Sequence, residues 1–95
     1  MSYTKTYSST RPSLDVDYFV YPPSMVTYIR DNYVLTGLRI GVSKTFSQDM
    51  LTRNFTTIWA DESAWNQYSQ DPTIQSLWTQ LRQYNSENGI VGSLN

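Results

Sequence analysis

Residues 38–46, LRIGVSKTF, and residues 51–59, LTRNFTTIW, decide the fold of this chain. In both runs large apolar side chains alternate with polar ones, and a period of two is typical of β-strands. A loop at Gln48-Asp49 predicts a hairpin that pairs apolar side chains on one face: Phe46 with Leu51, Val42 with Phe55 and Leu38 with Trp59. That register also sets Lys44 opposite Arg53 on the apolar face, and opposed like charges are unfavourable. We therefore expect these cations near the hairpin tip, beyond the helix cover, or else a shifted register.

Helical segments are predicted on both sides of the hairpin. Before it, apolar residues recur at helical spacing after Pro22-Pro23, which predicts a helix over residues 24–36. After it, Asp61 and Asp71 are candidate N-caps of a short helix and a long helix. The long helix ends at Asn88-Gly89. It carries the strongest periodic apolar stripe of the chain: Ile74, Leu77, Trp78, Leu81 and Tyr84.

Extended segments near both termini complete the predicted sheet. Residues 3–9 are rich in Tyr and Thr and predict a strand, and residues 90–94 are long enough for one short strand. Residues 14–21 also alternate and could form a further extended piece of the same edge. The predicted order is strand, helix, two strands, helix pair, strand. We therefore expect one α+β domain over residues 1–95, a ferredoxin-like β-α-β-β-α-β antiparallel sheet with helices on one face.

Composition excludes several classes of function. Eight acidic and seven basic residues give a net charge of −1, which supplies no electrostatic footprint for nucleic acid. No apolar run approaches the roughly 20 residues of a membrane span, and the N-terminus has no signal-peptide core, so we expect a cytoplasmic protein without membrane partners. The chain has no His and no Cys. Their absence removes most nucleophilic triads, the usual zinc sites and the best proton shuttle near neutral pH.

The remaining acidic groups have simpler explanations than chemistry. Asp15 and Asp17 could ligate a hard cation, but no glycine turn and no bidentate Glu follow them, as a calcium loop would require. Asp61 and Glu62 could form an acid–base pair, but helix capping accounts for both. We predict no catalytic residue, no metal and no cofactor.

A longer pattern resembles a known group of proteins. It consists of the strand Leu51–Ala60, which includes Trp59, the acidic cap and aromatic helix at Asp61–Tyr68, and the break at Asp71-Pro72. This pattern resembles the dimeric α+β barrel group, which includes antibiotic-biosynthesis-monooxygenase-like proteins and small uncharacterised proteins from marine phages and environmental sequences. The resemblance covers residues 3–90. It implies a homodimer in which two sheets face each other. If the chain derives from a phage, we expect it in the host cytoplasm or in a virion. The haem-degrading members use a His ligand, which this chain lacks.

Aromatic residues, 15% of the chain, mark a candidate ligand site. A cavity between sheet and helices could hold a small apolar ligand, and its candidate lining is Trp59, Trp65, Tyr68, Tyr33, Arg39 and Asn54. The alternative, which we favour, is that both Trp59 and Trp65 belong to the core, with their N–H groups bonded locally.

Candidate interface residues lie in the first half of the chain and on the polar face of the hairpin. The N-terminal tyrosines are too many to bury in so small a core, and Tyr is enriched at interfaces. The Ser/Thr-rich face of the sheet is either solvated or apposed to a partner sheet. The candidates are Tyr3, Tyr7, Tyr18, Tyr21, Ser43, Thr45 and Thr56.

Two functions follow from these observations. The first is a non-enzymatic homodimeric interaction or structural module of phage origin, because catalytic residue types are missing while aromatic surface is abundant. The second is a small-molecule-binding or cofactor-free monooxygenase-like protein with an apolar pocket. A pocket at Trp59 and Trp65 with a convergent polar group would distinguish the second function from the first.

Overall fold

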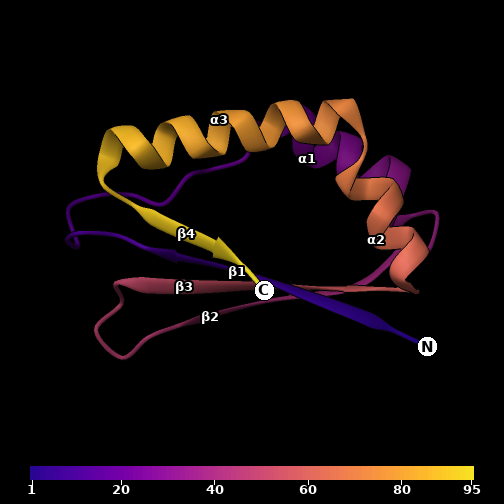
Figure 1. Ribbon diagram of the computed structural model, residues 1–95, viewed down its shortest axis with the longest axis horizontal. Coiled ribbons are helices and arrows are strands. Elements are labelled where there is room, and N and C mark those ends of the chain that lie inside the picture. Colours follow the sequence, from indigo (N-terminus) through magenta and orange to yellow (C-terminus); the bar gives the residue numbers. More distant parts are fainter.

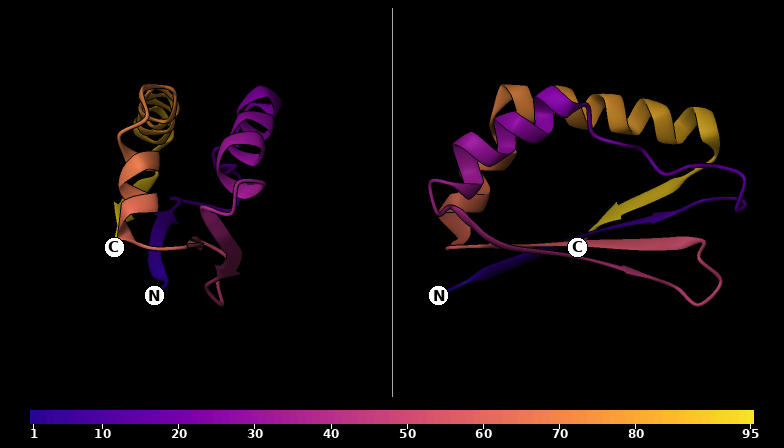
Figure 2. Two further views of the ribbon diagram at one scale, coloured as in Figure 1. Left: turned by 90° about the vertical axis from the view of Figure 1, so that its right-hand side faces the viewer. Right: turned by 180° about the vertical axis from the view of Figure 1, so that it is seen from behind.

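One antiparallel sheet and three α-helices make up the chain in a computed structural model that describes residues 1–95 (Figure 1). The elements are β1 (Tyr3–Thr10), α1 (Pro23–Ile29), a π-helical turn η1 (Arg30–Val34), β2 (Arg39–Phe46), β3 (Thr52–Trp59), α2 (Glu62–Ser69), α3 (Pro72–Asn88) and β4 (Val91–Leu94). The strand order is β2-β3-β1-β4, and every neighbouring pair is antiparallel. All helices lie on one side of the sheet, with α1 and α3 as two separate columns above it (Figure 2). The α+β class is thus confirmed.

The hairpin register differs from the predicted one by two residues. Phe46 lies opposite Arg53, and Lys44 lies opposite Phe55. The two cations are therefore not directly opposed, and the Lys44 ammonium lies 5.9 Å from the centre of the Phe55 ring instead. An attractive cation–π contact replaces the like-charge pair that the predicted register required.

The cause of this shift is a loop longer than two residues. Residues 47–51 connect the strands, and the Asp49 carboxylate accepts hydrogen bonds from Ser47 Oγ at 2.6 Å and from the Leu51 N–H at 3.0 Å. Met50 takes a φ of 64°. Asp side chains stabilise such turns through local hydrogen bonds to the backbone. Because the loop is longer, residues 41–46 of β2 lie opposite residues of β3 that are two positions later than predicted.

A β-bulge changes the face that Arg39 occupies. Arg39 pairs with Trp59 whereas Gly41 pairs with Ile58, so Ile40 is the additional residue on β2. A bulge of this kind redirects the side chains on one side of it. The alternation of the sequence places Arg39 on the polar face, but the bulge puts it on the helix-covered face beside Trp59.

The predicted helix over residues 24–36 is present as α1 and the wider turn η1, which together cover residues 23–34. Gly37 follows with a φ of 80°, the left-handed conformation that glycine adopts most readily. The N-caps are confirmed as well. Asp61 accepts from the Ala64 N–H and Asp71 from the Thr73 N–H, both at 2.8 Å, and Gly89 ends α3 with a φ of 69°.

Residues 14–21 form no strand, contrary to the extended piece that their alternation suggested. Both edges of β1 are already paired, to β3 and to β4, so no edge is free beside it. The segment instead crosses toward α3. There the Tyr84 hydroxyl donates to the Asp17 carbonyl at 2.7 Å, and the rings of Phe19 and Tyr84 lie 5.6 Å apart.

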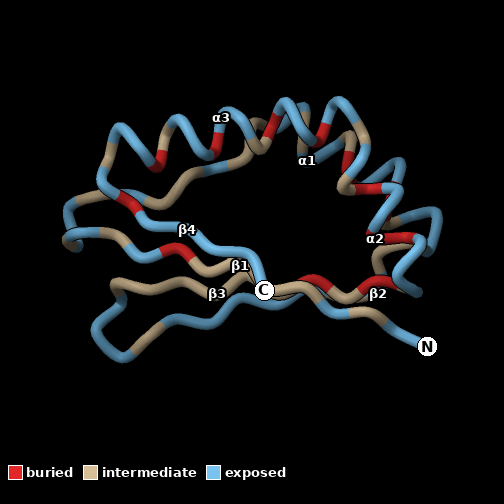
Figure 3. Tube along the Cα trace, viewed as in Figure 1, coloured by how far each residue is buried: buried red, intermediate tan, exposed pale blue.

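The core lies where α1, α2 and the start of α3 meet the sheet (Figure 3). Its buried members are Ile29, Tyr33, Trp59, Ala64, Trp65, Tyr68, Ile74 and Leu77. Trp59 is fully buried, and its indole N–H donates to Thr57 Oγ1 at 2.8 Å. The prediction of a core tryptophan with a locally bonded N–H is therefore confirmed for Trp59.

Candidate functional site

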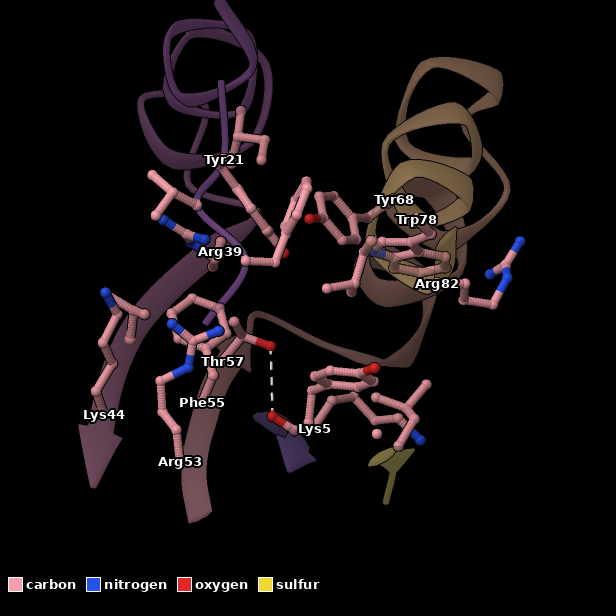
Figure 4. A pocket seen from close by; sticks show the side chains of 18 of the residues that line it. Lys5, Tyr21, Arg39, Lys44, Arg53, Phe55, Thr57, Tyr68, Trp78 and Arg82 are labelled. Carbon is pink, nitrogen blue, oxygen red and sulfur yellow. Dashed lines mark hydrogen bonds between the residues drawn. The ribbon is translucent and has the colours of Figure 1, made fainter. Parts of the chain in front are cut away.

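A cavity of about 650 Å³ lies between the sheet and the two helical columns (Figure 4). All four strands, all three α-helices and the segment Phe19–Tyr21 contribute to its walls. The cavity exists because α1 and α3 stand apart over the sheet and their side chains do not close the space between them. Its volume falls within the range of about 300–1,000 Å³ that is common for small-molecule sites.

Aromatic rings form much of the cavity wall. The aromatic lining residues are Tyr7, Phe19, Tyr21, Phe55, Trp65, Tyr68 and Trp78. Trp65 and Trp78 have ring centres 5.9 Å apart, and Tyr68 lies 5.8 Å from each of them. Burial raises the pKa of the Tyr68 phenol, so this hydroxyl stays protonated and available as a hydrogen-bond donor. Such a wall suits a planar or apolar molecular body.

The charged residues of the cavity all have the same sign. Five cationic side chains line it and no carboxylate does; they are Lys5, Arg39, Lys44, Arg53 and Arg82. The chain contains only seven Lys and Arg residues, so most of its positive charge surrounds this space. Arg39, Lys44 and Arg53 approach from β2 and β3, whereas Tyr68 and Trp78 come from the helices (Figure 4).

Arg53 is the cavity cation with a buried nitrogen that lacks a hydrogen-bond partner. This nitrogen is Nε, and the Arg53 guanidinium lies 4.7 Å from the centre of the Tyr18 ring. Burial lowers the pKa of the Arg53 guanidinium. The only ion pair of the chain joins Arg30 and Asp31 on the surface, so no carboxylate neutralises a cavity cation. A buried donor without a partner is unfavourable in the free protein.

The structure brings together half of the predicted ligand-binding residues. Trp65, Tyr68 and Arg39 line the cavity. Trp59 and Tyr33 instead lie in the packed core, where they are 0% and 4% exposed.

Asn54 lies on the opposite face of the sheet. There its side-chain oxygen accepts from Ser8 Oγ at 2.6 Å. Residues next to one another on a strand point to opposite faces, so Asn54 cannot share a face with Arg53 or Phe55.

The predicted interface residues fall into two groups. Tyr7 and Tyr21 line the cavity, Tyr3 packs against the core, and Tyr18 lies between the guanidinium groups of Arg11 and Arg53. These four rings are therefore turned toward the helix-covered side of the sheet. The remaining predicted residues, Ser43, Thr45 and Thr56, belong to the uncovered side.

The uncovered side of the sheet, which we call the hydroxyl face, carries no charged residue. By strand alternation its members are Thr4, Thr6, Ser8, Thr10, Gly41, Ser43, Thr45, Thr52, Asn54, Thr56, Ile58, Val91 and Ser93. Hydroxyl groups bridge β1 and β3 at Thr6–Thr56 (3.0 Å) and at Thr10–Thr52 (2.9 Å). The side chains of this face therefore satisfy part of their hydrogen-bonding capacity within the sheet.

The cationic lining is the feature that sequence reasoning missed. Lys44 and Arg53 interrupt the apolar face of the hairpin, and Lys5 shares a strand face with Tyr3 and Tyr7. The sequence feature that could have predicted this lining is the presence of charged residues on strand faces that are otherwise apolar. Arg82 borders the same cavity because α3 lies over the sheet, and no local sequence pattern reports that placement.

The carboxylates lie outside the cavity and serve local structure where they are bonded. No group of three or more His, Cys, Asp or Glu side chains is placed to hold a metal ion; Asp15 lies exposed in a turn, and Asp17 lies exposed just after it. No helix is both long and apolar enough to cross a membrane. No protein-family model, curated protein or solved structure matches this chain.

Proposed function

We propose that this protein binds a small molecule with an apolar, planar body in the cavity between the sheet and the helices. The supporting observation is the cavity itself, a space of about 650 Å³ with aromatic walls and convergent polar groups. This proposal takes up the second of the two functions considered from the sequence, without its monooxygenase part. Nothing in the cavity lining supplies a nucleophile with its base or a metal-ligand set, and the proposal is accordingly one of binding.

A neutral aromatic probe tests this function directly. N-phenyl-1-naphthylamine becomes fluorescent in apolar surroundings, and we expect saturable binding to the folded protein at one site per chain. The variant Val42→Trp places a large ring in the cavity and should weaken probe binding at least about tenfold, because it fills the space that the probe needs.

Ile40→Trp is the matched control for this experiment. Ile40 lies two residues away on the same strand, is similarly exposed (58% against 51% for Val42) and does not line the cavity. Its substitution should leave probe binding unchanged. Absence of saturable binding, or equal loss in the two variants, would contradict the proposed function.

We also propose a homodimer in which the hydroxyl faces of two chains pack together, within a ferredoxin-like split β-α-β arrangement. The observation that favours the dimer is the absence of charge from thirteen positions of an uncovered sheet face. Depletion of charged residues is a property of interface cores. The strand order β2-β3-β1-β4, with α1 between the non-adjacent strands β1 and β2, supports the ferredoxin-like arrangement.

Light scattering after gel filtration measures the oligomeric state. We expect a mass of twice the 11.0 kDa chain, and Thr56→Arg, at the centre of the hydroxyl face, should yield a monomer. The control Gln83→Arg adds the same charge on the exposed side of α3 and should remain a dimer. A monomeric wild-type protein at micromolar concentration would end this proposal and leave the binding function untouched.

A further inference from the structure

The charged side chains that line the cavity are all cationic. Five of the seven Lys and Arg side chains line it, and all eight carboxylates of the chain lie elsewhere. The protein as a whole carries a net charge of −1, so the positive cavity is surrounded by a negatively charged remainder. Like charges that gather without counter-charges repel one another, and a bound anion would relieve this repulsion.

From this arrangement we infer that the ligand is an organic anion, and that Arg53 is the residue that anchors its charged group. This inference rests on the proposed binding function and narrows it to a ligand class: an aromatic or alkyl body with one carboxylate, sulfonate or phosphate. Arg53 has a buried Nε without a hydrogen-bond partner, and no carboxylate lines the cavity around it. A guanidinium presents parallel N–H groups that match the oxygen spacing of these anions.

The surroundings of Arg53 also specify where the rest of the ligand would lie. Arg39 and Lys44 stand on the same side of the cavity as Arg53, and the rings of Tyr68 and Trp78 face them from the helices (Figure 4). The anionic group would therefore lie at β2 and β3 and the apolar body against α2 and α3. Tyr18, stacked on the guanidinium at 4.7 Å, restricts its orientation.

Two fluorescent probes with the same ring skeleton test this inference. 8-Anilinonaphthalene-1-sulfonate carries the anion, and N-phenyl-1-naphthylamine lacks it. We expect the wild-type protein to bind the sulfonate at least about tenfold more tightly, because charge-assisted hydrogen bonds contribute only to the anion. Binding of both probes with equal affinity would overturn the inference and preserve the proposed function, whereas binding of neither would remove the proposed function itself.

The variant Arg53→Met assigns the anchor. It should reduce the preference for the anionic probe, which is the ratio of the affinities for the two probes, at least about tenfold. The urea midpoint of the free protein should be equal to or higher than that of the wild type, because an unpartnered buried donor is removed. If Arg53 had a merely structural role, its replacement would lower the urea midpoint instead. A lowered midpoint, or an unchanged preference for the anionic probe, would overturn the assignment.

Arg30→Met is the matched control, since it removes the same charge from an exposed ion pair with Asp31, outside the cavity lining. It should leave the probe preference unchanged. Should Arg53→Met fail to fold, the double variant Arg39→Met/Lys44→Met must reduce the preference at least about tenfold, and an unchanged ratio overturns the inference. Titration of the wild type with 1-naphthylacetate and 1-naphthyl phosphate, followed by tryptophan quenching, then distinguishes a carboxylate from a phosphate ligand.

Discussion

At the residue scale, Asp71 connects two parts of the fold that are distant in the sequence. One carboxylate oxygen caps α3 through the Thr73 N–H, and the other accepts from the hydroxyls of Tyr28 and Tyr33, both at 2.6 Å. Partial burial alone would raise the pKa of Asp71, but these hydrogen bonds outweigh it and the net pKa is lowered. The candidate cap recognised from the sequence thus also holds the α1–η1 column in place.

Two substitutions of Asp71 distinguish the contribution of its helix cap from that of its negative charge. Asp71→Ala removes both and should lower the free energy of unfolding by about 2 kcal/mol, because a cap and two hydrogen bonds are lost. Asp71→Asn keeps an acceptor at the cap and should cost about half as much. Urea denaturation followed by tryptophan fluorescence measures both values, and equal stability of Asp71→Ala and the wild type would contradict the role assigned to this carboxylate.

The lowered pKa of Asp71 also gives a pH dependence. A carboxyl group whose pKa is depressed on folding stabilises the protein above its ordinary pKa of 3.8, and this contribution is lost as pH falls through the folded-state pKa. Stability of the wild type should therefore decline below about pH 4, and more steeply than that of Asp71→Asn. Parallel pH profiles of the two proteins in urea titrations would refute this prediction.

At the scale of the element, α3 shows how one helix serves both the core and the cavity. Leu77 is 1% exposed and packs in the core, whereas Leu81, one turn later, is 6% exposed and borders the cavity. Gln80 lies between them on the exposed side. The stripe predicted from apolar spacing is confirmed, and two of its members, Trp78 and Leu81, border the cavity.

Alanine substitutions along α3 should reflect this division. Leu77→Ala should cost about 3–5 kcal/mol, because it opens a void in a packed region. Leu81→Ala should cost about 2–3 kcal/mol, nearer the lower limit, because its side chain already borders a cavity. Gln80→Ala should remain within about 0.5 kcal/mol. Chemical denaturation measures all three, and a larger loss for Gln80 than for Leu81 would show that the buried face is misassigned.

The docking of β4 depends on a single glycine. A Cβ at Gly92 would overlap the Tyr7 hydroxyl, which accepts a hydrogen bond from the buried Asn85 amide at 3.2 Å. Gly92→Ala should therefore destabilise the protein by about 1–3 kcal/mol through overpacking. The exposed neighbour Ser93→Ala should change stability by no more than about 0.5 kcal/mol. Indistinguishable urea midpoints for the two variants would contradict this account of β4.

At the scale of the whole molecule, the segregation of charge matters more than its sum. A net charge of −1 conceals a cavity with five cations and an exterior that holds every carboxylate. This segregation of charge supports the proposal that a small anion binds in the cavity.

The absence of His and Cys predicts a flat pH profile for the proposed binding. His is the side chain whose ordinary pKa lies closest to neutral pH, and the chain contains none. The dissociation constant of 8-anilinonaphthalene-1-sulfonate should therefore vary by less than about twofold from about pH 6 to pH 8.5. Fluorescence titration measures this constant, and a transition near pH 7 would show that a group outside this account controls the site.

Local interactions explain which features were predictable from the sequence. Helix caps at Asp61 and Asp71, the apolar stripe of α3 and the alternation of β3 involve residues within a few positions of one another. Such patterns express backbone geometry, because the helical and strand periods are properties of short segments. The sequence by itself therefore determined the elements, their order and the α+β class.

Two local details that strand alternation does not report changed the hairpin: a loop closed by hydrogen bonds to Asp49 accompanies its shifted register, and the bulge at Ile40 moved Arg39 to the covered face. Long-range geometry decided the rest. The cavity arises from the spacing of α1 and α3 across the sheet, and its cations come from β1, β2, β3 and α3. Only tertiary structure could unite them, because segments distant in the sequence come together through packing and not through any repeat or spacing along the chain.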